Sequence, residues 1–376
     1  MKKKFIFPII LAIATLFSCR EDVMPQEETE YFPPISTTST HGLYVLNEGI
    51  MNNNKASLDY CDYGTGVYHR NIYGQANPSV IMGLGDVGND VKVYGSKLYV
   101  TLTNTGKVEI MDIKNNQRIK AISLKDARFI TFHNGKVYVT AYTNKVGGLP
   151  DAPNGIVVEI DTTSLNITRT VDVGRQPEEL CVVNNRIYVA NSGGLSAPDY
   201  ENKVSVIDIS SFSVIENIEV AVNLKRIRKD QYGDIYVNSL GDYYDVAPSL
   251  SVIDTETNTI KKTFDIAVED FWITGNTAYV IGLTYSQTSQ QPTISYNIID
   301  VQNETLLPNH FITDGTTSQI KLPTCVAVCP ETKNIYICDA INYTVPGTLY
   351  CFNPQGQKLW SVTTGDIPAH ITFVTK

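Results

Sequence analysis

The sequence predicts an all-β fold, a seven-bladed β-propeller made of four-stranded antiparallel blades. Three observations support this prediction. A phrase of the form LYV or IYV, with the variants VYV, AYV and IYI, returns seven times, each return occupies the same place in a series of strands and turns, and the chain begins and ends on complementary parts of that series. The spacing averages about 49 residues, close to the period of known propeller repeats. The seven tyrosines of the phrase are Tyr44, Tyr99, Tyr138, Tyr188, Tyr236, Tyr279 and Tyr336.

Each repeat contains four short strands in a constant order. A first strand such as "ELCVV" is followed by a tight turn with Asn or Gly, such as "HNGK", and then by the tyrosine strand. After a loop come two further strands, of which the third alternates and ends in Asp, as in "KVSVIDI". Period-two alternation with turn residues at regular intervals predicts antiparallel strands. Four strands per repeat favour a propeller over a sandwich.

The two ends of the domain predict how the ring closes. The domain starts at a tyrosine strand, residues 42–48, and ends in "HITFVTK", which has the character of a first strand. We therefore expect residues 370–374 to pair beside residues 42–48, as the innermost strand of the N-terminal blade. This arrangement removes two free sheet edges.

The N-terminal residues have the pattern of an export signal. Three lysines precede an apolar run that is too short for a comfortable membrane span, so residues 1–18 are predicted to be a lipoprotein signal peptide. Residues 16–19 resemble a bacterial lipobox, with Cys19 as the lipidated residue. Residues 19–41 are acidic and rich in Pro, Ser and Thr, and are expected to form a flexible tether before the propeller of residues 42–376.

Charge and cysteine content limit the partners. The net charge is −9, and it becomes more negative once the three lysines of the signal peptide are removed. This argues against nucleic acid or an anionic lipid surface as a partner, and leaves the lipid as the only membrane contact.

The cysteines Cys325, Cys329, Cys338 and Cys351 have no histidine among them, so no metal site is predicted. Buried thiols and a cross-strand disulfide both remain open.

Long loops identify the expected binding face. The connections from second to third strands are long, as in "NSGGLSAPDYENK" and "NSLGDYYDVAPS", whereas the turns at the opposite end are short. In an antiparallel blade these long loops all open on one side, which we call the loop face, and long loops on a rigid scaffold usually carry binding. We expect about half of the loop tyrosines to fold back over strand ends and the others to contact ligand. The candidates are Tyr142, Tyr200, Tyr243, Tyr244, Tyr285 and Tyr343.

The first strands should place a polar ring at the mouth of the central channel on the same face. Such a ring would supply hydrogen bonds to a ligand, or its members would satisfy one another in salt bridges. The candidates are Arg128, Arg175, Glu179, Arg226, Asp270 and His370. The sequence shows no Ser-His-Asp arrangement, phosphate loop or metal-ligand spacing, so no catalytic residue, metal or catalytic cofactor is predicted. Loop carboxylates such as Asp199 and Asp242 would serve a glycan-cleaving enzyme only if separate blades brought them together.

Several motifs resemble known families. The repeats resemble YVTN-type seven-bladed propellers over residues 41–376. More narrowly, "YVLNEGIMNNNKASLDYCD", "LGDVGND" and "VGRQPEEL", behind the leader, resemble the cobalamin-binding surface lipoproteins of Bacteroides (BtuG type). The "CREDV" segment resembles the signal that directs Bacteroidetes lipoproteins to the outer face of the outer membrane. The resemblance implies a non-enzymatic, lipid-anchored protein that faces the cell exterior, captures cobalamin and passes it to a TonB-dependent outer-membrane transporter. Tyrosine-rich loops would equally serve a propeller that binds a glycan or a protein.

Overall fold

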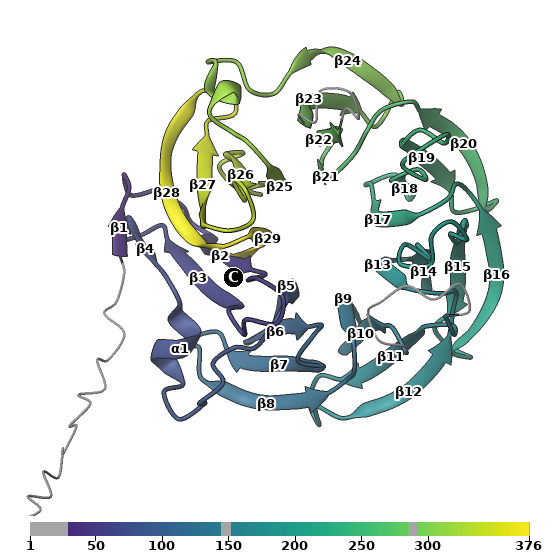
Figure 1. The fold of residues 1–376 in the computed structure, drawn as a ribbon, viewed down its shortest axis with the longest axis horizontal. Coiled ribbons are helices and arrows are strands. Elements are labelled where there is room, and N and C mark those ends of the chain that lie inside the picture. The colour runs from purple at the N-terminus through teal and green to yellow at the C-terminus, as the bar shows by residue number, and fades with distance from the viewer. Residues whose placement is uncertain (1–28, 144–151, 286–291, 376) are drawn as a thin grey trace, which may run out of the picture.

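The seven expected blades are present in the computed structural model, which describes residues 29–143, 152–285 and 292–375. Figure 1 shows seven sheets arranged in a ring, with the chain running once around the axis. Six sheets have four antiparallel strands and one has five. In the described residues the helices are the one-turn α1 (Ile72–Ala76) and the 3-10 turn η1 (Thr316–Ser318). The prediction of an all-β, seven-bladed propeller is confirmed.

We letter the blades A to G in chain order and give their strands from the axis outward. Blade A contains β29 (Pro368–Thr375), β2 (Thr40–Asn47), β3 (Ser57–Asp62), β4 (Val67–His69) and β1 (Thr29–Tyr31). Blade B contains β5 (Gly88–Tyr94), β6 (Lys97–Leu102), β7 (Lys107–Asp112) and β8 (Arg118–Ser123). Blade C contains β9 (Ala127–His133), β10 (Lys136–Ala141), β11 (Ile156–Asp161) and β12 (Ile167–Asp172). Blade D contains β13 (Pro177–Val183), β14 (Arg186–Asn191), β15 (Lys203–Asp208) and β16 (Ser213–Glu219).

The remaining blades follow the same order. Blade E contains β17 (Leu224–Lys229), β18 (Ile235–Ser239), β19 (Ser249–Asp254) and β20 (Thr259–Phe264). Blade F contains β21 (Asp270–Thr274), β22 (Thr277–Tyr285), β23 (Pro292–Asp300) and β24 (Thr305–His310). Blade G contains β25 (Pro323–Val328), β26 (Ile335–Asp339), β27 (Pro346–Phe352) and β28 (Lys358–Asp366).

The core lies between the blades, and the repeated tyrosines explain much of it. Each tyrosine lies on the second strand of its blade and packs into a cluster of apolar residues shared with the next blade. The Tyr44 hydroxyl, for example, donates to Asn116 Oδ1 in a turn of blade B, at 2.8 Å. Packing between the blades buries the aromatic ring, and for Tyr44 it also supplies a polar partner for the hydroxyl.

The ring closes as the sequence predicts. Strand β29 pairs antiparallel with β2, with His370 opposite Leu46 and Val374 opposite Gly42. The innermost strand of blade A therefore comes from the C-terminus, and its other strands come from the N-terminus. Strand β2 is therefore not left with the free inner edge that it would have in an open ring.

Residues 29–40, which the sequence assigned to the tether, belong to the folded domain. Strand β1 pairs with β4 as a fifth, outermost strand of blade A, and Phe32 stacks on Trp360 of blade G with ring centroids 4.4 Å apart. The Glu331 carboxylate accepts the backbone N–H groups of Ser39 and Thr40 at 2.9 Å. The strand pairing of β1 and the stacking of Phe32 hold these residues in the folded domain, although their polar composition predicted a flexible tether. The signal peptide, Cys19 and tether residues 19–28 lie outside the described residues.

Acidic side chains join neighbouring blades at the channel wall. The first strands are bulged, which leaves backbone N–H groups that need an acceptor from elsewhere. In every second blade a carboxylate on the first strand accepts such a group from the following blade. These pairs are Asp90 with Ile130 N (2.9 Å), Glu179 with Ile227 N (3.1 Å) and Asp270 with Val326 N (3.0 Å).

The six cysteines of the described residues are buried free thiols, although Cys325 and Cys338 lie opposite each other on β25 and β26. No group of His, Cys, Asp or Glu in the described ranges has an arrangement that could hold a metal ion. Within those ranges, too, no helix has the length and apolar character needed to cross a bilayer.

Candidate functional site

The loop face carries a pocket close to the axis, which we call the axial pocket. It has a volume of about 230 Å³ and is lined by residues from blades A to E. Its apolar wall includes Met51, Leu195, Leu240 and the ring of Tyr243, and its polar wall includes Arg128. A small apolar hollow with a few polar groups at its base is the usual form of a ligand site.

Arg128, Glu178 and Tyr142 form the polar wall of the axial pocket. Arg128 Nη2 and Nε donate to Glu178 Oε2 at 2.6 and 3.2 Å, and the Tyr142 hydroxyl donates to the other carboxylate oxygen. The guanidinium also lies over the Tyr142 ring, 5.0 Å from its centroid. Burial and the Glu178 charge raise the pKa of Tyr142, so its hydroxyl stays protonated and donates. Tyr142 is only 6% exposed, and it therefore forms the pocket wall as one of the tyrosines that fold back.

Tyr243 and Tyr244 lie at the rim, where they are 61% and 84% exposed. Burial raises the pKa of Tyr200, and the Tyr243, Asp242 and Tyr244 groups raise it further, which indicates that Tyr200 lies near both rim tyrosines. The loops of blades D and E thus bring three of the six expected tyrosines together. A cluster of flat, amphipathic rings offers contact area with little side-chain entropy to lose.

The loop that carries Tyr243 is held by one carboxylate. Tyr243 has a φ of 67°, a left-handed conformation that is uncommon for a bulky residue. Asp242 Oδ1 accepts the backbone N–H groups of Tyr244, Asp245 and Val246 at 2.9, 2.9 and 2.8 Å. These bonds lower the pKa of Asp242, so the loop is fixed by a carboxylate that stays ionised.

Arg175 supports the neighbouring loop of blade D. Its guanidinium pairs with Asp199 at 3.0 Å and with Glu201 at 2.9 Å, on either side of Tyr200. Arg175 therefore positions the loop that presents Tyr200.

Glu179, Arg226, Asp270 and His370 lie in the channel wall and are buried. Arg226 Nε is 3.4 Å from Asp270 Oδ1, and its guanidinium lies 4.9 Å from the Phe129 ring centroid. Glu179 and Asp270 share Arg228, at 3.1 and 2.8 Å. Ion pairs therefore occupy Glu179, Arg226 and Asp270, although Arg226 Nε and Asp270 Oδ1 have no hydrogen-bond partner among the described residues.

His370 is neutral in this network. Its ring nitrogens are 3.8 Å from Glu48 and 4.0 Å from Asp90. Burial lowers the pKa of His370 well below its usual value, and the nearby Arg226, Lys92, Arg228 and Lys225 charges lower it further.

The last two expected tyrosines are not part of the axial pocket. Tyr343, in the loop after β26 of blade G, is 40% exposed and does not line it. Tyr285 is the final residue of β22 in blade F, and its side chain lies outside the described residues. So does the segment 144–151 of the long blade C loop.

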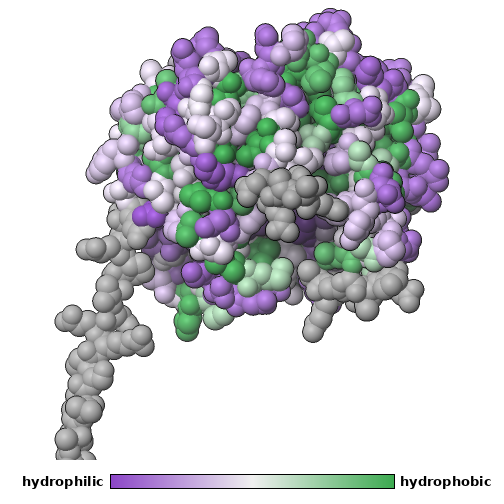
Figure 2. Space-filling view, turned by 45° about the horizontal axis from the view of Figure 1, so that its top comes forward, coloured by the Kyte–Doolittle hydropathy of each residue, from purple (hydrophilic) through white to green (hydrophobic). Residues whose placement is uncertain are grey.

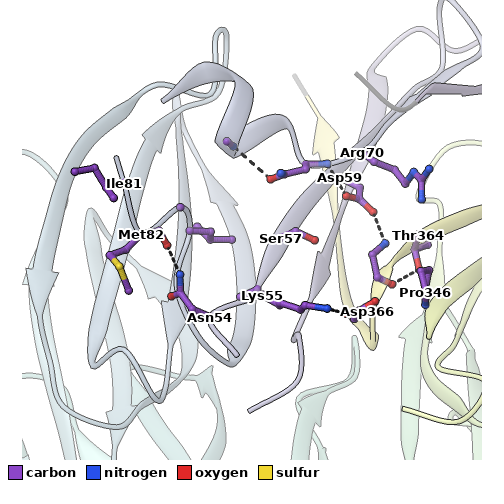
Figure 3. Close-up of a pocket in the computed structure, with 16 residues that line it drawn as sticks. Asn54, Lys55, Ser57, Asp59, Arg70, Ile81, Met82, Pro346, Thr364 and Asp366 are labelled. Carbon is purple, nitrogen blue, oxygen red and sulfur yellow. Dashed lines mark hydrogen bonds and ion pairs between the residues drawn. The ribbon is translucent and has the colours of Figure 1, made fainter. Parts of the chain in front are cut away.

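A larger pocket of about 500 Å³ opens on the loop side of blades A and G (Figure 3). Asn54 Nδ2 donates to the Met82 carbonyl at 2.7 Å, and Lys55 lies 3.4 Å from Asp366. In Figure 3, Ile81 and Met82 lie on one side, and Asp59, Arg70 and Thr364 on the other. Burial raises the pKa of Asp59, although Asn71 N–H, Asn47, Tyr68 and Gly365 N–H all donate to it. Asp59 is therefore part of the blade framework.

Sequence reasoning missed the apolar part of the axial pocket. Met51, Leu195 and Leu240 each stand in a long polar loop, and a lone apolar residue in such a loop was the available signal. Glu178 was also missed, because its role depends on contact with Arg128 from another blade. On the surface seen in Figure 2, hydrophobic residues lie in small groups among hydrophilic ones, without one dominant apolar area.

These features define the class of the protein: a seven-bladed β-propeller whose long loops surround an axial pocket. The chain belongs to the family defined by a domain of unknown function, DUF5074, whose model matches residues 41–365. No curated protein is significantly similar to the chain in sequence.

Several solved structures share the fold. Hydrazine synthase from Kuenenia stuttgartiensis has a TM-score of 0.61 at 13% identity, covering 76% of this chain and 89% of that one. A hypothetical selenium-binding protein from Sulfolobus tokodaii has a TM-score of 0.60 at 11% identity, covering 91% and 96%. A quinoprotein alcohol dehydrogenase-like protein from Bacteroides thetaiotaomicron has a TM-score of 0.59 at 15% identity, covering 90% and 79%. Structural similarity at sequence identities this low shows a shared fold, and it gives no information on activity.

Proposed function

We propose that the loop face captures cobalamin or a related corrinoid, and that the protein passes it to a TonB-dependent outer-membrane transporter. The observation that carries the proposal is the axial pocket with its rim of Tyr200, Tyr243 and Tyr244. The sequence resemblance to cobalamin-binding surface lipoproteins supports the same ligand.

The chemistry of the face suits such a ligand. A corrin is broad and flat, and exposed tyrosine rings supply flat contact area. Arg128 and Lys225 at the pocket present cations, each already paired with a carboxylate, Glu178 at 2.6 Å and Glu269 at 2.6 Å. The donor and acceptor positions that these ion pairs leave unused can bind the amide side chains and the phosphate of a corrinoid. Loops held by Asp242 and Arg175 lose little freedom on binding, which favours affinity.

Within this proposal the candidate residues have different roles. Tyr200, Tyr243, Tyr244 and Arg128 contact the ligand, and Tyr343 extends the contact area on blade G. Arg175 positions a loop. Glu179, Arg226, Asp270 and His370 shape the channel mouth beneath the ligand.

Calorimetry with cyanocobalamin tests the function. We expect a saturable heat with one ligand per chain. The absence of both heat and a visible-absorbance change at micromolar protein would reject corrinoid capture.

The proposed location has its own test. We propose that Cys19 is lipidated, that the protein is anchored in the outer membrane, and that the propeller faces the exterior. Cys19→Ala should release the protein from the membrane fraction, and protease added to intact cells should cleave the wild type. Protection of the wild type in intact cells would place the domain in the periplasm instead.

A glycan or protein ligand is the second candidate, because Tyr244 and Ile81 are 84% and 97% exposed and would suit a flat partner surface. Binding to an oligosaccharide array, with no heat from cyanocobalamin, would favour this candidate.

A further inference from the structure

A second pocket lies deeper in the channel than the residues that we propose to contact the corrinoid. We call it the lower pocket. Its volume is about 230 Å³. The strands that line it, β5, β9, β13, β17 and β21, are the first strands of blades B to F. In Figure 1 these strands stand around the axis of the ring.

The register of the blades explains which side chains reach it. In each blade one residue of the innermost strand pairs directly with the repeated tyrosine, and together these residues form a ring of equivalent positions. Five of the seven line the lower pocket. The full ring is Lys92, Thr131, Cys181, Arg228, Trp272, Ala327 and Thr372.

The charges that line the lower pocket are mostly positive. Lys92, Arg228 and Lys229 face a single lining carboxylate, Glu179. Both Glu179 oxygens are in use: one accepts Arg228 Nε at 3.1 Å, and the other accepts Ile227 N–H at 3.1 Å. Lys92 Nζ is 3.7 Å from Asp90, whose oxygens accept the N–H groups of Val91 and Ile130.

Arg228 lines the lower pocket and has one nitrogen without a hydrogen-bond acceptor. Its Nε and Nη2 are committed to Glu179 and Asp270, whereas buried Nη1 has no hydrogen-bond partner among the described residues. A buried guanidinium nitrogen without an acceptor is costly, and a small movement of the side chain toward the cavity would let a bound anion accept from it.

We propose that the lower pocket binds a small organic oxyanion, a carboxylate or phosphate ester with a short apolar body. Lys92 and Arg228 contact the charged end. Trp272, Ile273 and Leu180 contact the body. The site is independent of the proposed corrinoid capture and would stand if that function failed.

The fluorescence of Trp272 measures which small molecules reach the lower pocket. The chain has two tryptophans, so Trp360→Phe leaves Trp272 as the single tryptophan, which light beyond the tyrosine absorption band excites selectively. In this full-length variant, iodide should quench the fluorescence at least about threefold more efficiently than neutral acrylamide, once each is normalised to free tryptophan, because the cations concentrate anions. Benzoate should protect Trp272 from iodide, and the neutral isostere benzamide should not.

The matched variants are Lys92→Met and, as control, Lys114→Met in the exposed turn between β7 and β8. Lys92→Met should abolish the preference for iodide while leaving acrylamide quenching unchanged, and Lys114→Met should change neither. Lys229→Met provides a second test should Lys92→Met fold poorly. Equal normalised quenching by iodide and acrylamide in the parent, or equal protection by benzoate and benzamide, would overturn the proposal.

Discussion

The carboxylate of Asp270 accepts the backbone N–H of Val326 at 3.0 Å, across the boundary between blades F and G. Its other oxygen lies 2.8 Å from Arg228 of blade E. Burial raises the pKa of Asp270, but the Arg228 and Arg226 charges outweigh it, and the pKa is lowered overall. One side chain thus links three consecutive blades around the channel.

Asp270→Ala should therefore destabilise the ring. It leaves Arg228 Nη2 and the Val326 N–H without their partner, and breaking a buried ion pair typically costs about 3–5 kcal/mol. The urea midpoint of unfolding measures the effect. Asp172→Asn, on exposed outer strand β12, is the control and should leave the midpoint unchanged. An Asp270→Ala midpoint equal to that of the control would contradict the structural role.

Replacing both Tyr243 and Tyr244 by alanine should weaken cyanocobalamin binding at least about tenfold, because two aromatic contacts are lost together and a tenfold change needs only about 1.4 kcal/mol. Both side chains are exposed, so the thermal midpoint should not change. The control is Asn134→Ala with Asn185→Ala, in the turns of the opposite face. If the turn variant loses the ligand and the tyrosine variant keeps it, the binding face has been wrongly assigned.

Asp242→Ala should also weaken cyanocobalamin binding, although it removes no aromatic ring from the site. The three N–H groups that Asp242 accepts would lose their partner, and residues 243–246 would have to be ordered on binding. Hydrogen exchange at Tyr244, Asp245 and Val246 should accelerate, while exchange in β18 and β19 stays the same. Unchanged exchange in this loop would show that other contacts hold it.

His370 should make the domain less stable in mild acid. Its pKa is lowered in the folded protein, so its contribution to stability is complete above the unfolded pKa of about 6.5. The contribution is lost as pH falls toward the folded pKa, with a slope of at most about 1.4 kcal/mol per pH unit. We expect His370→Asn to reduce the loss of stability between pH 7 and 5. Parallel curves for the two proteins would exclude His370 as the cause.

Deleting the last eight residues should abolish cooperative unfolding, because it removes most of β29 and exposes the inner edge of β2. Differential scanning calorimetry would show this as loss of the single transition, and deletion of Lys376 alone serves as the control. A truncated protein with the wild-type transition would rule out β29 as the closing strand.

The sequence by itself determined the fold, the number of blades and the closure, because these depend on local patterns repeated along the chain. The tyrosine of each repeat, the Asp that ends each third strand and the turn residues between them specify strands and register without reference to distant contacts. Loop length also determined the candidate face, since alternating strand direction places Tyr142, Tyr200 and Tyr243 on the same side.

Tertiary structure alone decided what each candidate residue contacts. Tyr142 and Tyr243 occupy similar loops, yet one is buried against Glu178 of the next blade and the other stays exposed. Asp270 pairs with Arg228 and Val326, more than forty residues away in either direction. Such contacts depend on the distances between blades, which local sequence patterns do not encode. For the same reason the sequence predicted a tether at residues 29–40. Their contacts, Phe32 with Trp360 and Ser39 with Glu331, join the N-terminal segment to the last blade, and the closed ring brings these parts together.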